Sequence, residues 1–385
     1  GVDKTRKEAR GSFLNTVSST DLVVGARSGP TNLLLYSVFR IGNATNNVSW
    51  ETYETIAAMD EVAWTIPISL GDSHRGFRVM GTTTDYFDHY GYGNDQTLVF
   101  DTGGPFGGVY DAVLGADVAR DLGYAMGDEI IIAHGLVSAD FANHSDKPFT
   151  VVGVLDRTGT PVDRTVHVGL AGIEAIHVDW RDGARSAVPL DAEQALKFEL
   201  SPTSITAFMV GLENKALTFR VQREINEYSE EPMSAIIPGA TLAEFWRTIS
   251  AVEQVLFIVS GLVLVAGFLG MLTTMLSTLN ERRREIAVLR AVGARAVHVV
   301  VLIALETVFV AAVGCLVGVG LLYGLLAAAQ SYVARRFGVD LTLSWLDSTQ
   351  VLIVAAVILG AALVGLIPGF VAYRRSLQDG LSLKV

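Results

Sequence analysis

The sequence contains a single cysteine, Cys315, which lies inside an apolar run. One cysteine forms no disulfide within the chain, and a cysteine-rich metal site is excluded as well. The glycine-rich Gly-x-x-x-x-Gly-Lys-Ser/Thr loop is absent, as are the Gly-x-Ser-x-Gly and His-Glu-x-x-His motifs. The chain therefore does not bind ATP through a P-loop, and no pairing of a nucleophile with a base predicts an enzyme.

Charge is distributed unevenly along the chain. Residues 1–245 hold 33 acidic and 18 basic residues, a net charge of −15, whereas residues 246–385 hold 7 and 11, a net charge of +4. The overall charge of −11 argues against nucleic-acid binding, which requires a basic surface. The mean hydropathy is +0.40, too apolar for an ordinary soluble protein. The sequence thus predicts an acidic, water-soluble first part and an apolar second part.

Three long apolar runs occur in the second part, at residues 249–279, 299–329 and 350–373. A helix that spans a bilayer needs about 20 apolar residues, and each run is long enough. Three such runs predict a membrane α-helical bundle.

Basic residues in the loops predict the orientation of this bundle. The connection between the first two runs carries Arg282, Arg283, Arg284, Arg290 and Arg295, and the tail carries Arg374, Arg375 and Lys384. Because short cytoplasmic loops are enriched in Lys and Arg, the connection and the C-terminus are expected in the cytoplasm and residues 1–245 outside. We expect the location to be a bacterial cytoplasmic (inner) membrane. Residues 1–40 hold no span, so a fourth span upstream of Gly1 is expected.

Small and ionisable residues mark positions within the spans. Glycines spaced four apart allow close helix packing, and they occur as Gly314 with Gly318, Gly320 with Gly324, and Gly365 with Gly369. Glu306 is the only ionisable residue deep in a span. Two interpretations of Glu306 remain open: a partner inside the bundle, or a carboxylate that reaches the cytoplasmic headgroups.

Residues 1–245 predict a mixed α/β domain of two subdomains. A helix from Ser49, strands at 62–70 and 76–83 around a turn at Gly71, Asp72 and Ser73, and a strand–helix–strand unit at 204–237 predict a porter-like subdomain from 46–92 and 200–240. An inserted β-rich subdomain is expected at about 95–195, with a helix at 116–124 and strands at 127–133, 148–155 and 166–170. Thr241 and Glu244 form a capping-box pattern. It predicts one helix of about 57 Å that continues into the first span.

Two short segments contain residues that could form a binding site. His134, Asp140, His144 and Asp146 lie within thirteen residues, and such side chains are ligands for metal ions. Polar loop residues between two strands explain the same pattern. His167 and His177 are expected to pack or to face solvent.

The other segment, residues 281–296, predicts a short basic helix with apolar Ile286, Val288, Leu289 and Val292. It is either a helix on the membrane surface or a helix that inserts into a groove of a soluble partner.

The motif ERRREIAVLRAVGA at residue 281 resembles the cytoplasmic coupling segment of MacB/FtsX-type permeases of ABC transporters, a family that includes the lipoprotein-releasing permeases. The stretches VLGADVARDLGYAMGDEIII and FTVVGVL resemble that family's periplasmic domain, and the end LIPGFVAYRRSLQDGLSL resembles its closing signature. The resemblance covers almost the whole chain. It implies a MacB-like periplasmic domain at 1–245 and an FtsX-like permease domain at 246–385 with a coupling segment at 280–296.

The resemblance also implies partners and a mechanism. A homodimer with four spans per subunit is expected, bound to a separate cytoplasmic ABC ATP-binding subunit that holds ATP and Mg²⁺; this chain binds no cofactor itself. The residues expected to face that subunit are Glu281, Arg282, Arg283, Glu285, Ile286, Leu289 and Arg290. Mechanotransmission, in which ATPase closure moves the coupling segment and long helices move the outer domain, is the expected mechanism.

Three functions remain open at this point. Export or extraction of a peptide, lipid or lipoprotein is the first, with membrane lipid and a periplasmic or lipoprotein partner in contact with the chain. An FtsX-like subunit that signals to a cell-envelope hydrolase is the second. A metal-linked envelope transport system is the third, and it depends on the histidine and aspartate loop alone.

Overall fold

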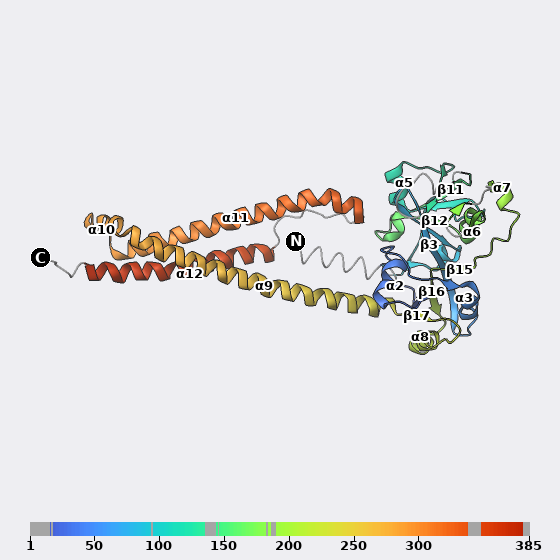
Figure 1. Cartoon of the computed structure of the whole chain (residues 1–385), viewed down its shortest axis with the longest axis horizontal. Coiled ribbons are helices and arrows are strands. Elements are labelled where there is room, and N and C mark those ends of the chain that lie inside the picture. Colours follow the sequence, from blue (N-terminus) through green and yellow to red (C-terminus); the bar gives the residue numbers. More distant parts are fainter. Residues whose placement is uncertain are drawn as a thin grey trace. The chain divides into compact units, whose positions relative to one another are not determined.

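The computed structural model describes residues 16, 18–93, 95–134, 144, 146–181, 184–185, 190–337 and 348–379. Within this part the chain forms two compact units, which divide between Ile249 and Ser250. The first unit contains a large sheet with short helices, and the second contains long helices (Figure 1). This division matches the predicted mixed α/β domain followed by a helical bundle.

One mixed sheet organises the first unit. Along its main path the strands are β17 (Met233–Ile236), β1 (Leu22–Ala26), β16 (Ala207–Leu212), β3 (Val62–His74), β4 (Phe77–Thr82), β12 (Thr165–Gly169), β8 (Asp111–Leu114), β11 (Phe149–Leu155) and β7 (Phe100–Gly103). The pairs β4–β12 and β8–β11 are parallel, and the other pairs on this path are antiparallel. Through the β4–β12 pair, the strands of the predicted insertion continue the sheet of the porter-like part.

Short strands complete the unit. Off the main path, β10 (Ala133–His134) pairs with β3, and β9 (Glu129–Ile130) pairs with β11. Three separate two-stranded pairs join β13 (Trp180–Arg181) to β14 (Ala184–Arg185), β15 (Ser204–Ile205) to β2 (Val48–Ser49), and β5 (Gly91–Tyr92) to β6 (Gln96–Thr97).

The thirteen-residue strand β3 differs from the prediction. The expected turn at Gly71, Asp72 and Ser73 is wrong, because all three residues continue β3, and Asp72 and Ser73 pair with β10. The hairpin instead turns at Arg75 and Gly76, whose φ angles of 46° and 88° are both left-handed, as a two-residue hairpin loop requires. The consequence is that Asp72 lies buried in a strand, with 5% of its surface exposed.

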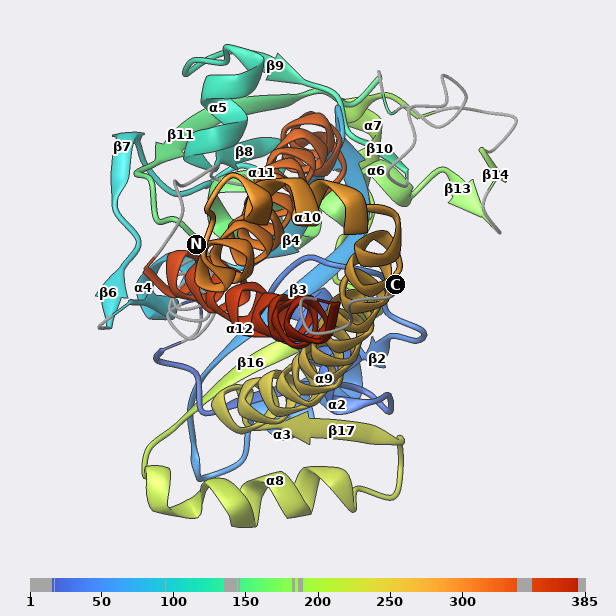
Figure 2. The same ribbon diagram turned by 90° about the vertical axis from the view of Figure 1, so that its left-hand side faces the viewer.

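Helices cover both faces of the porter-like half of the sheet. Neighbouring residues of a strand point to opposite faces, and Val23 and Val24 of β1 belong to different cores. Val23 packs with residues of α2 (Pro30–Ser37) and α4 (Asp85–His89). Val24 packs with residues of α3 (Trp50–Ala57) and α8 (Thr218–Asn226), and Figure 2 shows α8 alongside β17. The hydroxyl of Ser49 accepts a hydrogen bond from the Thr52 amide and caps α3, at the predicted start of that helix.

A third core lies mainly in the inserted half. It joins β4 to β8, β9, β11 and β12, with α5 (Ala116–Leu122) and α6 (Leu170–His177). A third helix, α7 (Ala192–Ala195), begins with a capping box at Asp191 and Gln194. The 3₁₀ turns are η2 (Pro161–Arg164) and η3 (Lys215–Leu217).

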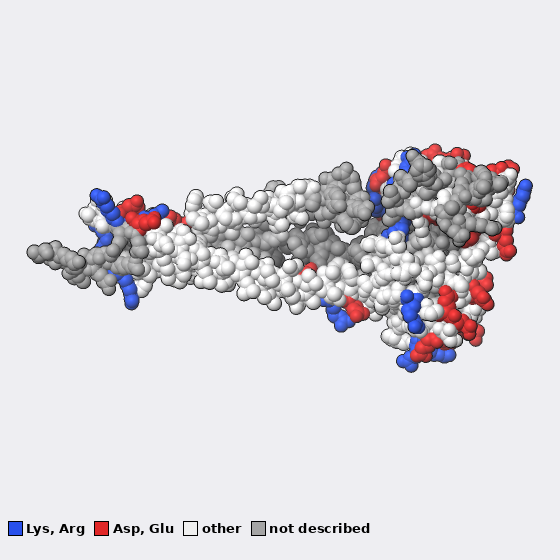
Figure 3. Space-filling view, viewed as in Figure 1, with Lys and Arg blue, Asp and Glu red and all other residues white. Residues whose placement is uncertain are grey.

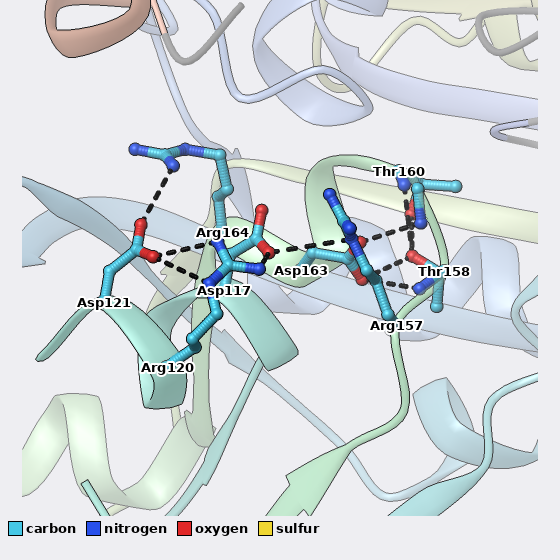
Figure 4. A network of polar contacts seen from close by, with 9 residues as sticks. Asp117, Arg120, Asp121, Arg157, Thr158, Thr160, Asp163 and Arg164 are labelled. Atoms are coloured by element: carbon cyan, nitrogen blue, oxygen red, sulfur yellow. Dashed lines mark hydrogen bonds and ion pairs between the residues drawn. The ribbon is translucent and has the colours of Figure 1, made fainter. Parts of the chain in front are cut away.

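A polar network fixes the loop before η2 (Figure 4). The buried carboxylate of Asp163 accepts hydrogen bonds from the amide and hydroxyl of Thr158, at 2.8 and 2.7 Å, and from the Gly159 amide at 2.7 Å. Next to it, Arg120 pairs with Asp117 at 2.7 Å and with Asp121 at 2.8 Å. The burial of Asp163 is tolerated because its oxygens have several donors.

Four helices form the second unit, and the first of them begins before the boundary between Ile249 and Ser250. They are α9 (Pro238–Glu281), α10 (Arg283–Ala291), α11 (Ala296–Phe337) and α12 (Ser348–Asp379). Three are long and apolar enough to cross a membrane, over Pro238–Leu279, Val297–Ala328 and Gln350–Arg374, and these ranges contain the bulk of the three predicted runs. The predicted start at Thr241 is wrong, since α9 already begins at Pro238 and the Thr241 amide bonds to the Ile237 carbonyl. Proline suits the first helical position because its missing N–H would have no partner there.

Glycine permits close contact between α11 and α12. A Cβ at Gly365 would lie 2.7 Å from Thr307 Oγ1, and one at Gly369 would lie 3.0 Å from Val300 Cγ1. In contrast, Gly314, Gly318, Gly320 and Gly324 face open space among the described residues. Figure 3 shows the middle of the long helices without Lys, Arg, Asp or Glu on the visible face. In the single chain this surface is uncovered, as expected for helices that contact lipid or another chain.

Candidate functional sites

The short helix α10 stands between two candidate spans. It ends in a Schellman motif: Gly293 has a φ of 103°, its amide bonds to the Arg290 carbonyl, and the Ala294 amide bonds to the Leu289 carbonyl. Glycine is suited to this position because a left-handed φ carries no Cβ penalty. The predicted end of the basic helix near Gly293 therefore has a local cause.

One face of α10 turns toward the helices of its own unit. Ile286 is half-buried and packs against a cluster of Leu279, Val299, Ile303 and Ala372. Arg282, one helical turn before Ile286, places its guanidinium on Glu306 of α11, with Nη1 at 2.7 Å from Oε2 and 2.9 Å from Oε1. Of the residues expected to face a partner, Arg282 and Ile286 thus contact the bundle of their own chain. Glu306 has a partner within its own unit, as the first interpretation expected.

The face of α10 that carries Val288 is open. Val288 and the C-cap residue Val292 are exposed by 57% and 85%, whereas Leu289, which is 44% exposed, lines the same hollow as Arg282 and Ile286. Glu281, Arg284 and Glu285 are exposed as well, and Arg290 is half-buried. The side chain of Arg283 lies outside the described residues. Exposed valine and leucine flanked by charged residues form a surface that can receive a protein partner.

A second candidate site lies in the α/β unit, where three histidines meet. His134 ends β10, His177 ends α6, and His144 lies in the segment between β10 and β11. The Nε2 atoms of His144 and His134 are 3.2 Å apart, and Nε2 of His177 is 3.3 Å from Nδ1 of His134. These nitrogens lie within 4.8 Å of one another, close enough to hold a metal ion.

Asp72 of β3 belongs to the same cluster. The register of the β3–β10 pair places His134 opposite Asp72, and Nδ1 of His134 lies 3.0 Å from Oδ1 of Asp72. Nε2 of His177 lies 3.7 Å from the same oxygen. The ring of Trp180 closes one side, 4.5 Å from the His134 ring and 5.1 Å from the His144 ring between centroids.

Burial sets the protonation of this cluster. Burial, assisted by the charges of His134 and His177, lowers the pKa of the His144 imidazole to about 4, so that it is neutral near pH 7. Burial opposes ionisation of Asp72, but hydrogen bonds from His134 and His177 outweigh it, and the pKa of Asp72 is lowered. His134 and His177 have side chains that are 32% and 29% exposed, so the cluster is open to solvent on one side.

The cluster differs from the loop that the sequence suggested. His134 and His144 do come together, whereas Asp140 lies outside the described residues and Asp146 lies 3.6 Å from Nζ of Lys147. Asp72 and His177 were missed: Asp72 was predicted in a turn, and His177 was expected to pack or face solvent. No local signal identifies them, because only the β3–β10 register and the position of α6 bring them to His134.

The comparisons with known proteins define a class for this architecture. A model described as MacB-like periplasmic core domain matches residues 9–228, and a model described as FtsX-like permease C-terminal matches residues 257–379. Together they describe an α/β periplasmic domain followed by the helices of an ABC transporter permease. The chain belongs to the MacB/FtsX-type family of ABC transporter permeases.

Curated relatives match parts of the chain. The macrolide export ATP-binding/permease protein MacB of Chromobacterium violaceum is 32% identical over 126 residues, which are 33% of this chain and 18% of that protein. The ABC transporter permease MJ1507 of Methanocaldococcus jannaschii is 26% identical over 171 residues, which are 41% of this chain and 42% of that protein. The matches thus span less than half of the length of either relative.

Two solved structures align with part of the chain. The periplasmic region of MacB from Actinobacillus actinomycetemcomitans aligns at 10% identity and a TM-score of 0.36, over 64% of this chain and 98% of that one. The extracellular domain of the noncanonic ABC-type transporter YknZ from Gram-positive bacteria aligns at 13% identity and a TM-score of 0.32, over 56% and 99%.

Proposed function

We propose that the chain is a non-catalytic permease subunit that couples a separate cytoplasmic ATP-binding subunit to its α/β domain on the outer side of the membrane. The coupling is mechanotransmission: closure of the ATP-binding subunits moves α10, and the long helices carry that movement outward. The observation that carries this proposal is α9, a helix of 44 residues that starts two residues after β17 and ends one residue before the N-cap of α10. At 1.5 Å per residue it is about 66 Å long, more than the thickness of a bilayer.

The ATP-binding subunit docks on the open face of α10 in this proposal. Val288 and Val292 are the apolar anchors, since both are more than half exposed. Helices that insert into a groove on a partner use anchors with this spacing, with charged residues at the edge. ATP and Mg²⁺ are bound by the partner, because this sequence contains no P-loop.

The proposal includes a topology and a dimer. The five arginines of the loop around α10 support a cytoplasmic position for this loop and the C-terminus, and an outer position for the α/β unit. A second copy of the chain covers part of the uncovered helix surface; the glycines of α11 at 314, 318, 320 and 324 support this arrangement. The cargo is proposed as a class only: a peptide, lipid or lipoprotein extracted from the outer leaflet and exported.

The docking step is tested with two substitutions on α10, Val288→Asp and Val292→Asp. Each places a carboxylate where a partner groove is expected, so co-purification with the cognate ATP-binding subunit should fall at least tenfold, and cargo-stimulated ATP hydrolysis should be lost. The matched control is Val99→Asp in the α/β unit, where the valine is similarly exposed at 52%. Because all three valines face outward, none of these substitutions should lower the thermal stability of the chain. Unchanged association in both α10 variants would refute the docking assignment.

The topology is tested by cysteine labelling in intact cells. After Cys315→Ala, a cysteine at position 285 on α10 should resist a membrane-impermeant thiol reagent, while a cysteine at position 99 should react. Equal reaction of the two positions from outside contradicts the proposed orientation.

A further inference from the structure

We propose that His134, His144 and His177 bind one divalent transition-metal ion, with Zn²⁺ as the reference ion and Asp72 as the carboxylate that orients His134. The family comparison assigns no metal to this unit, and the proposal does not depend on transport.

The spacing of the ring nitrogens is the first argument. Zn–N bonds are about 2.0–2.1 Å, so two nitrogens on a tetrahedral ion lie roughly 3.3 Å apart. The Nε2 atoms of His134 and His144 meet this spacing at 3.2 Å. Nε2 of His177 lies 3.3 Å from Nδ1 of His134, and one ring nitrogen of each histidine lies within 4.8 Å of the other two. Two imidazoles that point the same nitrogen at each other share at most one proton, whereas a metal ion uses the lone pairs of both.

Asp72 explains why Nε2 of His134 is available. When Nδ1–H of His134 donates to Oδ1 of Asp72 over 3.0 Å, the proton is held on Nδ1, and Nε2 keeps its lone pair toward His144. A carboxylate behind a ligating histidine is a recurrent arrangement in zinc sites, because it fixes the tautomer and the orientation of the ring. Asp72 is well placed for this role, since its backbone is fixed in β3 and its side chain is only 6% exposed.

The state of His144 is the second argument. Its exposed fraction is 1%, and its Nε2 faces Nε2 of His134 at 3.2 Å. A buried ring held in this direction presents the lone pair of Nε2 to an ion that His134 also binds.

The donor set selects the class of ion. Three imidazole nitrogens suit Zn²⁺, Ni²⁺, Co²⁺ or Cu²⁺, whereas Mg²⁺ and Ca²⁺ prefer oxygen ligands. His134 and His177 are about one third exposed, so an ion can enter from solvent and a water molecule can take the remaining position. Such a site joins β3, β10, α6 and the segment at His144, which are separate in sequence, and it therefore stabilises this half of the α/β unit.

The test measures Zn²⁺ binding to the full-length chain in detergent, purified without a polyhistidine tag. Isothermal titration and metal analysis should give one Zn²⁺ per chain. His134→Gln combined with His177→Gln should abolish this binding, while His298→Gln and His89→Gln, at exposed histidines outside the cluster, should retain it. Co²⁺ should give the visible absorption of a four-coordinate nitrogen site in the wild type only. Equal Zn²⁺ binding by the wild type and the double variant would overturn the proposal.

A second variant keeps the test informative if the double variant does not fold. Asp72→Asn retains the three ring nitrogens and the size of the side chain but weakens the acceptor, so Zn²⁺ affinity should fall about 10- to 100-fold. Added Zn²⁺ should raise the melting temperature of the wild type, since a ligand that binds only the native state stabilises it. Added Mg²⁺ should not. Unchanged Zn²⁺ affinity in Asp72→Asn, or an equal rise with Mg²⁺, would contradict the proposed site.

Discussion

A single nitrogen of Arg282 contacts both carboxylate oxygens of Glu306, at 2.7 and 2.9 Å. Arg282 is the N-cap residue of α10, and Glu306 lies in α11, 24 residues further along the chain. The ion pair therefore joins the start of the short helix to a candidate membrane span. It gives the ionisable residue of that span a partner, and it leaves the Arg282 side chain 49% exposed.

We predict that Arg282 and Glu306 stabilise the chain as a pair. Arg282→Gln and Glu306→Gln should each lower the melting temperature in detergent. The loss of stability in the double variant should be smaller than the sum of the losses in the two single variants. Because the side chains are 49% and 34% exposed, the interaction energy should be modest, about 0.5–1 kcal/mol. A double-mutant cycle measures it, with Arg284→Gln as the control on the exposed side of α10. Strict additivity of the two substitutions contradicts the prediction.

The glycines of α12 should be far less tolerant than those of α11. Gly365→Leu or Gly369→Leu forces a side chain into Thr307 or Val300, so each should lower stability by roughly 1–3 kcal/mol or more. Gly318→Leu meets open space and should leave the melting temperature of the monomer in detergent nearly unchanged. Thermal unfolding followed by tryptophan fluorescence compares the three variants. The packing is refuted if monomeric Gly318→Leu loses as much stability as Gly365→Leu.

A buried histidine of β12 should make the α/β unit sensitive to acid. His167 is completely buried, and its ring stacks on Tyr86 at 5.2 Å between centroids. Burial and the nearby charge of Arg40 lower the pKa of His167 to about 3. The unfolded chain binds this proton near pH 6.5, so His167 contributes stability above that pH, and this contribution is lost as the pH falls toward 3.

His167→Phe measures this contribution. Between pH 7 and pH 4, the melting temperature of the variant should fall less than that of the wild type, because the variant lacks a group that takes up a proton on unfolding. One such group contributes at most about 1.4 kcal/mol per pH unit to the free energy of unfolding. His89→Gln, an exposed histidine, should keep the wild-type slope. Identical pH slopes for wild type and His167→Phe would show that His167 does not resist protonation.

The ion pair of Lys147 with Asp179 is buried, with side chains that are 0% and 1% exposed. Oδ2 of Asp179 also accepts a hydrogen bond from the Leu190 amide at 3.2 Å. Lys147→Met should destabilise the chain by about 3–5 kcal/mol, because it leaves a carboxylate buried without its cation. Lys147→Met with Asp179→Asn should recover part of that loss, and Lys215→Met, at an exposed lysine, should have almost no effect. Chemical denaturation checks all three, and a double variant no more stable than Lys147→Met contradicts the pair.

Local sequence signals account for much of the observed fold. The three apolar runs predicted the three long helices, because the requirement for about 20 apolar residues depends on composition alone. Ser49 predicted the start of α3 through its side-chain cap, and Gly293 marked the end of α10 through its left-handed backbone. The arginine-rich segment between the first two spans likewise predicted α10 as a short helix of its own.

The histidine site and the inner face of α10 required the tertiary structure. Gly71, Asp72 and Ser73 are residue types that favour turns, and only the pairing of β10 with β3 places Asp72 and Ser73 in a buried strand. The distance of 62 residues between Asp72 and His134, and of 43 between His134 and His177, contains no local signal of contact. The sequence alone does not distinguish an Arg282 that faces a partner from one that contacts Glu306; the packing of α10 against α11 shows the contact with Glu306. Composition and local backbone chemistry thus determined the elements of this protein, whereas the strand register and helix packing decided which side chains meet, because contacts between distant residues arise only when the chain is folded.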